Sequence, residues 1–388
     1  MAYSDDSGSL RRALSRVGLL LFLMIAAGSE AQIFPEKDWA LKSPAGAGLK
    51  QKHLDKIKSY LGGHGFIARD GYQIFAWGAY DVPADIASAA KPWYSFFLLK
   101  AVDQGRLSGL DAKAAVFEPR LNALNAGLGF KDRQITFRHL ASQTSCYGVC
   151  EQPGAAFDYN DYQTALFWDI LFTKVYGASA EKVDQMVFRP LLADILQFQD
   201  EPTMLAFGAA KRLGRISVSP RDFARFGLLF GRGGMWDGTR LLSPQLAHMA
   251  VSDPLPAQLP RTNGAAAEMI PGQRSIGGGA NMRAHHGAYS WMWWVNHPDR
   301  NGYRYWPEAP PDVFAALGHK NGKRGVAVMP SLDIVISWNS PRLNDQAPFD
   351  GRGTPHPLNV VFKLLARAKN DRERTKPDRS NTASPQRQ

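Results

Sequence analysis

A serine and a lysine three residues apart, Ser88 and Lys91, are the first pair of side chains in this sequence suited to covalent chemistry. At the first turn of a helix the two share one face, so the lysine amine can reach the serine hydroxyl and, when desolvated, accept its proton. The same spacing recurs at Ser179 and Lys182, in a charged stretch that we expect to be exposed. The first pair precedes an apolar segment typical of a buried helix, which favours Ser88 as a nucleophile and Lys91 as its proton acceptor.

A second group of reactive side chains is Tyr159-Asn160-Asp161. A phenol near an ammonium group can have its pKa lowered enough to relay protons. The adjacent amide and carboxylate side chains can hold catalytic or substrate groups in place. Taken alone, a tyrosine in an aromatic stretch is more often part of a core than a catalyst.

A third group, Lys320-Asn321-Gly322, comes directly before a predicted strand at 325–329. A cation at the edge of a strand can attract a substrate carboxylate. A glycine there lets substrate approach the backbone, whose N–H groups can bind an oxyanion. A simple hairpin turn is the alternative interpretation of this segment.

The order of the three groups resembles the signature set of penicillin-recognising serine enzymes, namely Ser-x-x-Lys, then Tyr-x-Asn or Asp, then Lys-x-Gly. The sequence is similar to the serine β-lactamase-like family, in particular the branch with class C β-lactamases, D-alanyl carboxypeptidases, esterases of β-lactamase fold and 6-aminohexanoate-dimer hydrolase. Four further stretches carry the resemblance: 138–145, which looks like the family's HLLTHTSG segment, 153–159, 219–227 and 330–335. The resemblance covers most of residues 66–338 and indicates the superfamily, not one activity.

The resemblance implies roles for four residues. Ser88 would attack a carbonyl carbon, and Lys91 would take or share its proton. Tyr159 would serve as acid and base for the leaving group and for the deacylating water. Asp161 stands where the family has Asn or Asp, and would orient Lys91 or the substrate. The chain is therefore expected to be a serine hydrolase that cleaves an ester or amide through an acyl-enzyme.

The third motif leaves two assignments open. Lys320 would match the cation of the family's Lys-Thr-Gly element, with Gly322 as its glycine. In many relatives this element is His-x-Gly or His-Gly-Gly, so His319 is the other candidate. The resemblance implies an oxyanion hole made by the backbone N–H of Ser88 and one from the strand after Gly322, which we assign to Lys323.

The elements expected to position these residues are strands near both ends of the chain with helices between them. This pattern predicts an α/β fold of the α+β type, with an antiparallel sheet built from N- and C-terminal segments, flanking helices and an inserted, mostly helical region, as in β-lactamases and transpeptidases. Ser219-Pro220 predicts a helix start, with serine as the N-cap. The predicted elements are helices at 50–62, 93–105 and 357–366, a hairpin at 66–75 turning at Asp70-Gly71, and strands at 291–295, 325–329 and 334–338.

The N-terminus has the pattern of a signal peptide. Arg11, Arg12 and Arg16 precede an apolar stretch at 17–27 that is short for a membrane span, and small residues at positions 29 and 31 suit cleavage after Ala31. An uncleaved anchor or a buried helix is the alternative. We therefore expect an exported protein, periplasmic or secreted, with a signal peptide (1–31), a hydrolase domain (32–367), a disordered basic tail (368–388) and no stable membrane span after cleavage.

The two cysteines, Cys146 and Cys150, flank a short segment that contains Gly148. In an oxidising compartment a local disulfide between them is plausible. A zinc site is disfavoured because a second pair of ligands at zinc-site spacing is missing.

The bulk composition narrows the partners. The formal charge of +11 brings nucleic acid into consideration, but no run of basic residues with interleaved aromatics is present, so we expect a small-molecule ester, amide or peptide substrate and no nucleic acid. No cofactor and no metal are expected. The oligomeric state is not predicted.

Three alternatives to this function stay open. The first is a catalytically inactive protein of the same fold that senses cell-wall peptides. The second is a true β-lactamase, which would use the same catalytic residues with a different pocket. A metal-dependent hydrolase using His285, His286, His297 or His319 is the third, although no acid lies at ligand spacing. Within the enzyme interpretation, a cluster of aromatic residues at 291–306 either lines a cleft or packs in the sheet, and we expect short p-nitrophenyl esters to be cleaved faster than cephalosporins.

Overall fold

The computed structural model describes residues 32–278, 284–346, 349 and 354–368, and the statements below concern these residues. The predicted signal peptide (1–31) and the tail from residue 369 onward lie outside them. From Phe34 onward the chain forms one compact unit. No helix in the described part is both long enough and apolar enough to cross a membrane.

A seven-stranded antiparallel sheet forms the centre of this unit. Its strands β1 and β12 come from opposite ends of the chain and pair along their full lengths, from His64 opposite Asn339 to Arg69 opposite Ile334. The predicted sheet assembled from N- and C-terminal segments is therefore confirmed. In spatial order the strands are β2 (Tyr72–Trp77), β1 (His64–Arg69), β12 (Ile334–Asn339), β11 (Arg324–Met329), β10 (Phe314–Gly318), β9 (Trp293–Val295) and β8 (Tyr289–Ser290).

Two hairpins of this sheet have turns built on residues with positive φ, the first at the predicted Asp70-Gly71. Between β1 and β2, Asp70 and Gly71 both have positive φ, at 54° and 83°, which suits the tight turn that joins antiparallel strands. Between β11 and β12, the 3₁₀ turn η11 (Pro330–Leu332) is followed by Asp333 in the left-handed region. These turns fix the register that buries β1, β11 and β12 on both faces.

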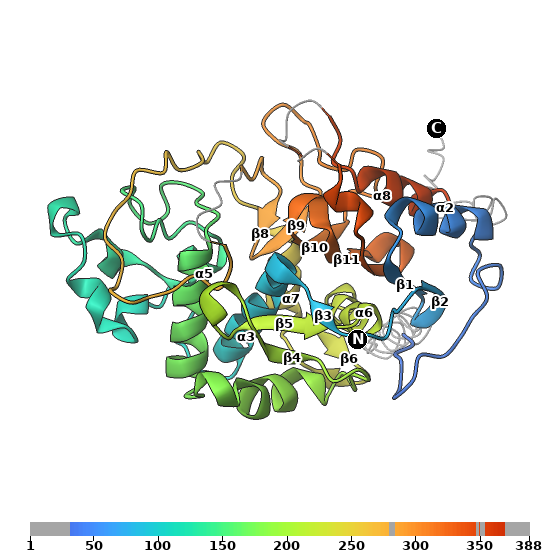
Figure 1. The fold of residues 1–388 in the computed structure, drawn as a ribbon, viewed down its shortest axis with the longest axis horizontal. Coiled ribbons are helices and arrows are strands. Elements are labelled where there is room, and N and C mark those ends of the chain that lie inside the picture. The colour runs from blue at the N-terminus through green and yellow to red at the C-terminus, as the bar shows by residue number, and fades with distance from the viewer. Residues whose placement is uncertain (1–31, 279–283, 347–348, 350–353, 369–388) are drawn as a thin grey trace, which may run out of the picture. The chain divides into compact units, whose positions relative to one another are not determined.

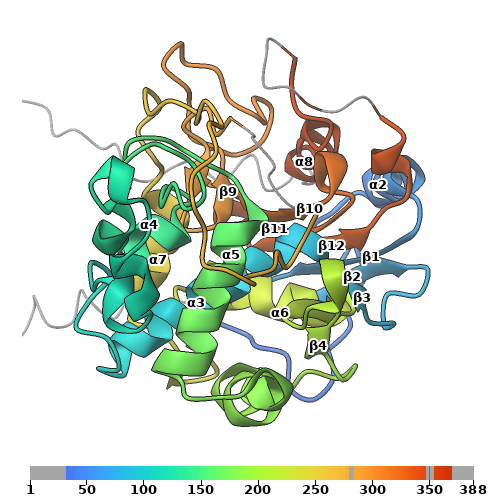
Figure 2. The same cartoon turned by 60° about the vertical axis from the view of Figure 1, so that its left-hand side comes forward.

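Helices cover both faces of the sheet. Helices α2 (Gln51–Leu61) and α8 (Asn359–Ala366) pack together on one side, and α6 (Pro220–Gly231) packs against β1, β11 and β12 on the other (Figures 1 and 2). The predicted N-cap of α6 is present, with Ser219 Oγ accepting a hydrogen bond from the Asp222 N–H at 3.2 Å. A Cβ at Gly227 would lie 2.8 Å from Val326 Cγ2, so this glycine allows α6 to approach the sheet closely.

The region between β2 and β8 is mostly helical, as predicted, and it also holds two small sheets (Figure 1). Its first helix, α3, is almost entirely buried, and Trp93 stacks on Phe226 of α6 with ring centroids 4.0 Å apart. The α-helices are α3 (Lys91–Asp103), α4 (Phe137–Ala141), α5 (Asp161–Trp168) and α7 (Pro244–Ser252). The strands are β3 (Ala84–Asp85), β4 (Thr203–Ala206) and β5 (Arg215–Val218) in one sheet, and β6 (Met235–Trp236) and β7 (Thr239–Arg240) in the other.

Further helical segments, of 3₁₀ or π type, connect these elements. Two of them, η6 and η8, are π-helical, and the others are 3₁₀ turns. They are η1 (Ala87–Ala90), η2 (Ala114–Val116), η3 (Pro119–Asn122), η4 (Ala126–Leu128), η5 (Lys131–Gln134), η6 (Asp169–Val175), η7 (Ala180–Lys182), η8 (Asp184–Ala193), η9 (Ala209–Lys211), η10 (Lys320–Gly322), η11 and η12 (Arg342–Asn344).

Two details differ from the sequence-based expectation. The predicted strand at 291–295 is a turn followed by β9, because Trp291 and Met292 have φ of 45° and 73°. The cysteines are not bonded to each other: Cys146 Sγ donates to the Ala156 carbonyl and Cys150 Sγ to the Ala266 carbonyl. The disulfide that seemed plausible is therefore absent from the structure.

Candidate active site

Ser88 lies on a tight turn between β3 and α3, formed by residues 85–90 and called here the Ser88 turn. Ala87 has a φ of 51°, a backbone conformation that costs a non-glycine residue free energy and persists only where neighbours enforce it. Here Asp85 Oδ1 accepts a hydrogen bond from the Ala87 N–H at 2.9 Å, and the Ala89 N–H donates to the Ile86 carbonyl at 3.1 Å. The side chain of Ser88 is thereby held at the wall of a cavity.

Lys91 begins α3, one helical turn after Ser88. Its Nζ lies 3.3 Å from Ser88 Oγ and 2.7 Å from Asp161 Oδ1, and its side chain is only 4% exposed. Pro92 falls in the first turn of α3, where no backbone N–H donor is needed. The predicted Ser88–Lys91 pair therefore has a geometry that allows proton transfer.

The charge on Lys91 is set by its neighbours. Burial disfavours the ammonium form, but the Asp161 carboxylate and the Tyr159 hydroxyl outweigh burial, so the pKa of Lys91 is raised. At neutral pH the resting site therefore holds Lys91 as an ammonium ion paired with Asp161.

Asp161 reaches Lys91 because the preceding residue starts α5. Asn160 Oδ1 accepts hydrogen bonds from the N–H groups of Tyr162 (2.7 Å) and Gln163 (3.1 Å), the usual N-cap arrangement. Within this motif Asn160 therefore has a structural part, and the carboxylate at the first helical position is the group that contacts the lysine.

Tyr159 lies next to Lys91 in an aromatic layer. Its side chain is buried, and the ring centroid is 4.6 Å from Lys91 Nζ, a cation–π distance. Tyr289 and Trp294 pack around the ring at centroid distances of 6.0 and 6.2 Å. Tyr159 therefore contacts Lys91 directly. Lys91 lines the cavity, whereas Tyr159 is not among the lining residues.

Two adjacent glycines, Gly277 and Gly278, also line the cavity. A Cβ at Gly277 would lie 1.9 Å from Asp161 Oδ2, so no other residue fits beside this carboxylate. No motif considered above includes these glycines, although the Gly-Gly-Gly run at 277–279 is a visible signal in the sequence.

Strand β10 ends against the Ser88 turn. A Cβ at Gly318, its last residue, would lie 2.1 Å from the Ile86 carbonyl oxygen and 3.1 Å from the Ala89 nitrogen. In the described part of the chain, no acceptor takes a hydrogen bond from the backbone N–H of Ser88 or of His319. These two N–H groups are the candidates for an oxyanion hole, with His319 in place of the predicted Lys323.

Only part of the third motif lines the cavity. His319 and Lys320 line the cavity, but Lys320 belongs to the 3₁₀ turn η10, beyond the strand that contacts Ser88. Gly322 is buried, and a Cβ there would lie 2.9 Å from Leu317 Cδ2. Lys323 is half-buried and does not line the cavity. His319 and Lys320 therefore line the same cavity as Ser88, whereas Gly322 and Lys323 do not line it.

The cavity beside Ser88 has a volume of about 460 Å³. Tyr94 and Arg215 also line the cavity, and neither belongs to a motif recognised in the sequence. None of the aromatic residues at 291–306 lines it, and Trp293 and Trp306 are fully buried in the core. Among the described residues, no group of three or more His, Cys, Asp and Glu is placed to hold a metal ion. The lining residues are Ala87, Ser88, Lys91, Tyr94, Asp161, Thr164, Arg215, Ile276, Gly277, Gly278, Leu317, His319 and Lys320.

The sequence matches no family model and no curated protein. Solved structures with the same fold include a provisionally named 6-aminohexanoate-dimer hydrolase from Bacillus anthracis, with a TM-score of 0.55 and 15% identity over 86% of this chain and 87% of that one. A provisionally named β-lactamase from Bacteroides dorei gives a TM-score of 0.56 and 17% identity over 82% and 100%. A penicillin-binding protein homologue from Caulobacter crescentus gives 0.51 and 15% over 87% and 99%.

Proposed function

Because the chain has the fold of the serine β-lactamase-like family, we propose that it is a serine hydrolase that cleaves esters or amides through an acyl-enzyme on Ser88. One observation carries the proposal. At the wall of the cavity, Lys91 Nζ lies 3.3 Å from the Ser88 hydroxyl and 2.7 Å from the Asp161 carboxylate. A buried amine between a hydroxyl and an acid is suited to move a proton to and from that hydroxyl.

In the proposed acylation, Ser88 Oγ bonds to the substrate carbonyl carbon while its proton passes to the neutral amine of Lys91. The carbonyl oxygen takes the negative charge and accepts hydrogen bonds from the N–H groups of Ser88 and His319. Two such donors contribute about 3 kcal/mol each in the transition state. As the tetrahedral intermediate collapses, the leaving group takes the proton from Lys91.

Deacylation reverses these roles. Water gives a proton to Lys91 and its oxygen attacks the acyl carbon, and the proton then returns to Ser88 Oγ as the acid product leaves. We assign Asp161 and Tyr159 as positioning residues, because both contact Lys91 and set its charge.

The first experiment for this proposal is active-site labelling with a fluorophosphonate, which reacts with activated serines. Intact protein should gain one phosphonyl group, and peptide mapping should place it on Ser88. Ser88→Ala should lose the label, whereas Ser179→Ala, which removes the serine of the exposed Ser-x-x-Lys repeat, should keep it. A label at another residue, or no reaction of the folded wild type, contradicts the proposal.

A second prediction concerns pH. Catalysis requires neutral Lys91, whose pKa is raised by Asp161, so the wild-type kcat/KM should increase with pH until Lys91 loses its proton. In Asp161→Asn the attraction that raises this pKa is removed and burial lowers it. The rising limb of the pH–rate profile should therefore move to lower pH.

The matched control for this pH shift is Asp169→Asn. Asp169 forms an ion pair with Arg212 and does not line the cavity. Its profile should coincide with that of the wild type on a neutral p-nitrophenyl ester. An unchanged limb in Asp161→Asn would mean that the titrating group is not Lys91.

We further propose that the protein is exported, periplasmic or secreted. Support comes from the arginines ahead of a short apolar stretch at 17–27 and from the small residues at 29 and 31. We also propose small-molecule esters, amides or short peptides as substrates, since a cavity of about 460 Å³ suits a ligand of that size.

A further inference from the structure

Arg215 lies on the cavity wall beside Ser88, and the proposed mechanism gives it no part. Its guanidinium is bound by Asp85 through both Nε and Nη2, with a distance of 3.0 Å from Nε to Oδ1. The same Oδ1 accepts the hydrogen bond from the Ala87 N–H that shapes the Ser88 turn. One carboxylate therefore fixes the guanidinium relative to the nucleophile, although Arg215 and Asp85 are 130 residues apart in the chain.

The positive charges around this cavity are not balanced. Asp85 is shared, because Arg324 Nη1 also lies 3.3 Å from its Oδ2, so two guanidinium groups have one carboxylate between them. Lys91 is neutralised by Asp161. Lys320, on the cavity wall, makes no ion pair within the described residues. The cavity and its immediate ion-pair partners thus carry a surplus of positive charge.

The same positive charges act on His319, which also lines the cavity. Burial lowers the pKa of this imidazole, and the positive charges of Arg324 and Arg215 lower it further, against the smaller opposing effect of Asp85. His319 is therefore neutral at neutral pH. A site whose own histidine is disfavoured as a cation favours an anion brought in by a ligand.

We infer that the substrate carries an anionic group, a carboxylate in its simplest form, and that Arg215 binds it while Ser88 attacks. The planar guanidinium can pair with a carboxylate through two hydrogen bonds, and in a partly enclosed cavity such a pair is stronger than at an open surface. The inference rests on the proposed serine hydrolase function and adds to it the charge class of the substrate.

The test compares esters that differ by one carboxylate. Mono-p-nitrophenyl glutarate carries the carboxylate on the acyl side, and p-nitrophenyl butyrate is its neutral counterpart. A second pair, p-carboxyphenyl butyrate and phenyl butyrate, places the carboxylate on the leaving group. Each is assayed with wild type, Arg215→Met, Arg215→Lys, Ser88→Ala and the control Lys211→Met, which removes a positive charge from an exposed residue outside the cavity.

The expected result is a loss selective for one anionic ester. Arg215→Met should lower kcat/KM for that ester by on the order of 30-fold more than for its neutral partner, as for a charged hydrogen-bonded contact. Arg215→Lys should restore part of the difference, Lys211→Met should match wild type, and added salt should reduce the preference. The pair that shows the loss identifies the side of the scissile bond that carries the anion.

Two results would overturn the inference. If Arg215→Met lowers kcat/KM equally for the anionic and neutral members of both pairs, Arg215 only supports the Ser88 turn, and the hydrolase proposal stands without an anion site. If wild type and Ser88→Ala hydrolyse every ester at the same rate, the proposed function itself fails, and the inference that rests on it fails too.

Discussion

Replacing Lys91 with methionine is expected to lower kcat for ester hydrolysis by about 100- to 10,000-fold, the range for a side chain that transfers a proton in the transition state. Methionine keeps the length and the apolar stem of lysine, but it cannot accept a proton from Ser88 Oγ, 3.3 Å away. The rate that remains would come from substrate binding and the two oxyanion donors. Steady-state kinetics on p-nitrophenyl butyrate measure the loss.

A second variant separates proton transfer from charge. Lys91→Arg keeps a cation for Asp161 but cannot accept a proton at ordinary pH, because guanidinium groups stay protonated. If Lys91 works as the proton acceptor, Lys91→Arg should be nearly as slow as Lys91→Met. Substantial activity in Lys91→Arg would show that only the positive charge matters. Lys182→Met, from the exposed repeat of the same spacing, should have wild-type kinetics.

Sequence alone could predict only those contacts of this site that form between residues close together in the chain. Ser88 and Lys91 share a helical turn, so their spacing by itself brings the amine to the hydroxyl. The same is true of the cap at Asn160, which aims the next residue, Asp161, along the start of α5. Tyr159 and Asp161 lie about 70 residues from Lys91, and only the resemblance to a known family linked them to it.

Strand β10 shows why the rest was missed. Its sequence, Phe-Ala-Ala-Leu-Gly, has little β propensity, and its conformation depends on pairing with β9 and β11. When this strand is not recognised, the cationic motif is expected at Lys320–Gly322 and the second oxyanion donor at Lys323. The structure instead brings Gly318 against the Ser88 turn and makes His319 the candidate donor.

Contacts between segments far apart in the chain could not be predicted from the sequence either. Arg215 in β5 forms an ion pair with Asp85 in β3. The sequence of these two short strands has no periodic pattern that predicts them. By contrast, β1, β11 and β12 are apolar runs bounded by turn residues, and such runs predict strands well. The large sheet was therefore predictable, whereas the wall of the cavity that faces Ser88 required the folded structure.

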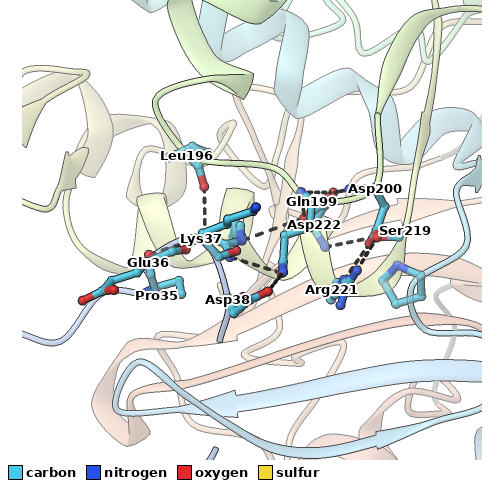
Figure 3. A network of polar contacts seen from close by, with 12 residues as sticks. Pro35, Glu36, Lys37, Asp38, Leu196, Gln199, Asp200, Ser219, Arg221 and Asp222 are labelled. Carbon is cyan, nitrogen blue, oxygen red and sulfur yellow. Dashed lines mark hydrogen bonds and ion pairs between the residues drawn. The ribbon is translucent and has the colours of Figure 1, made fainter. Parts of the chain in front are cut away.

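Replacing Arg225 with methionine is expected to lower the free energy of unfolding by about 3–5 kcal/mol, the usual cost of removing one partner from a buried charged network. This guanidinium, in α6, is fully buried and donates to the backbone carbonyls of Glu36 (2.8 Å), Lys37 (2.8 Å) and Leu196 (3.0 Å). Glu36 and Lys37 belong to the segment 34–39 near the start of the described chain. Figure 3 shows them beside Leu196 and Asp222. Burial lowers the pKa of Arg225 to about 10, which still leaves it charged at neutral pH.

Methionine at position 225 would leave these carbonyls buried without a donor, and each unpaired group costs about 1–3 kcal/mol. The matched control is Arg189→Met, since the Arg189–Glu201 ion pair (2.8 Å) is exposed and its removal should change stability by less than about 1 kcal/mol. Urea denaturation compares the two variants, and hydrogen exchange at residues 34–39 should quicken only in Arg225→Met. Equal stabilities, or unchanged exchange in that segment, would show that other donors replace the guanidinium and that Arg225 does not anchor the start of the fold.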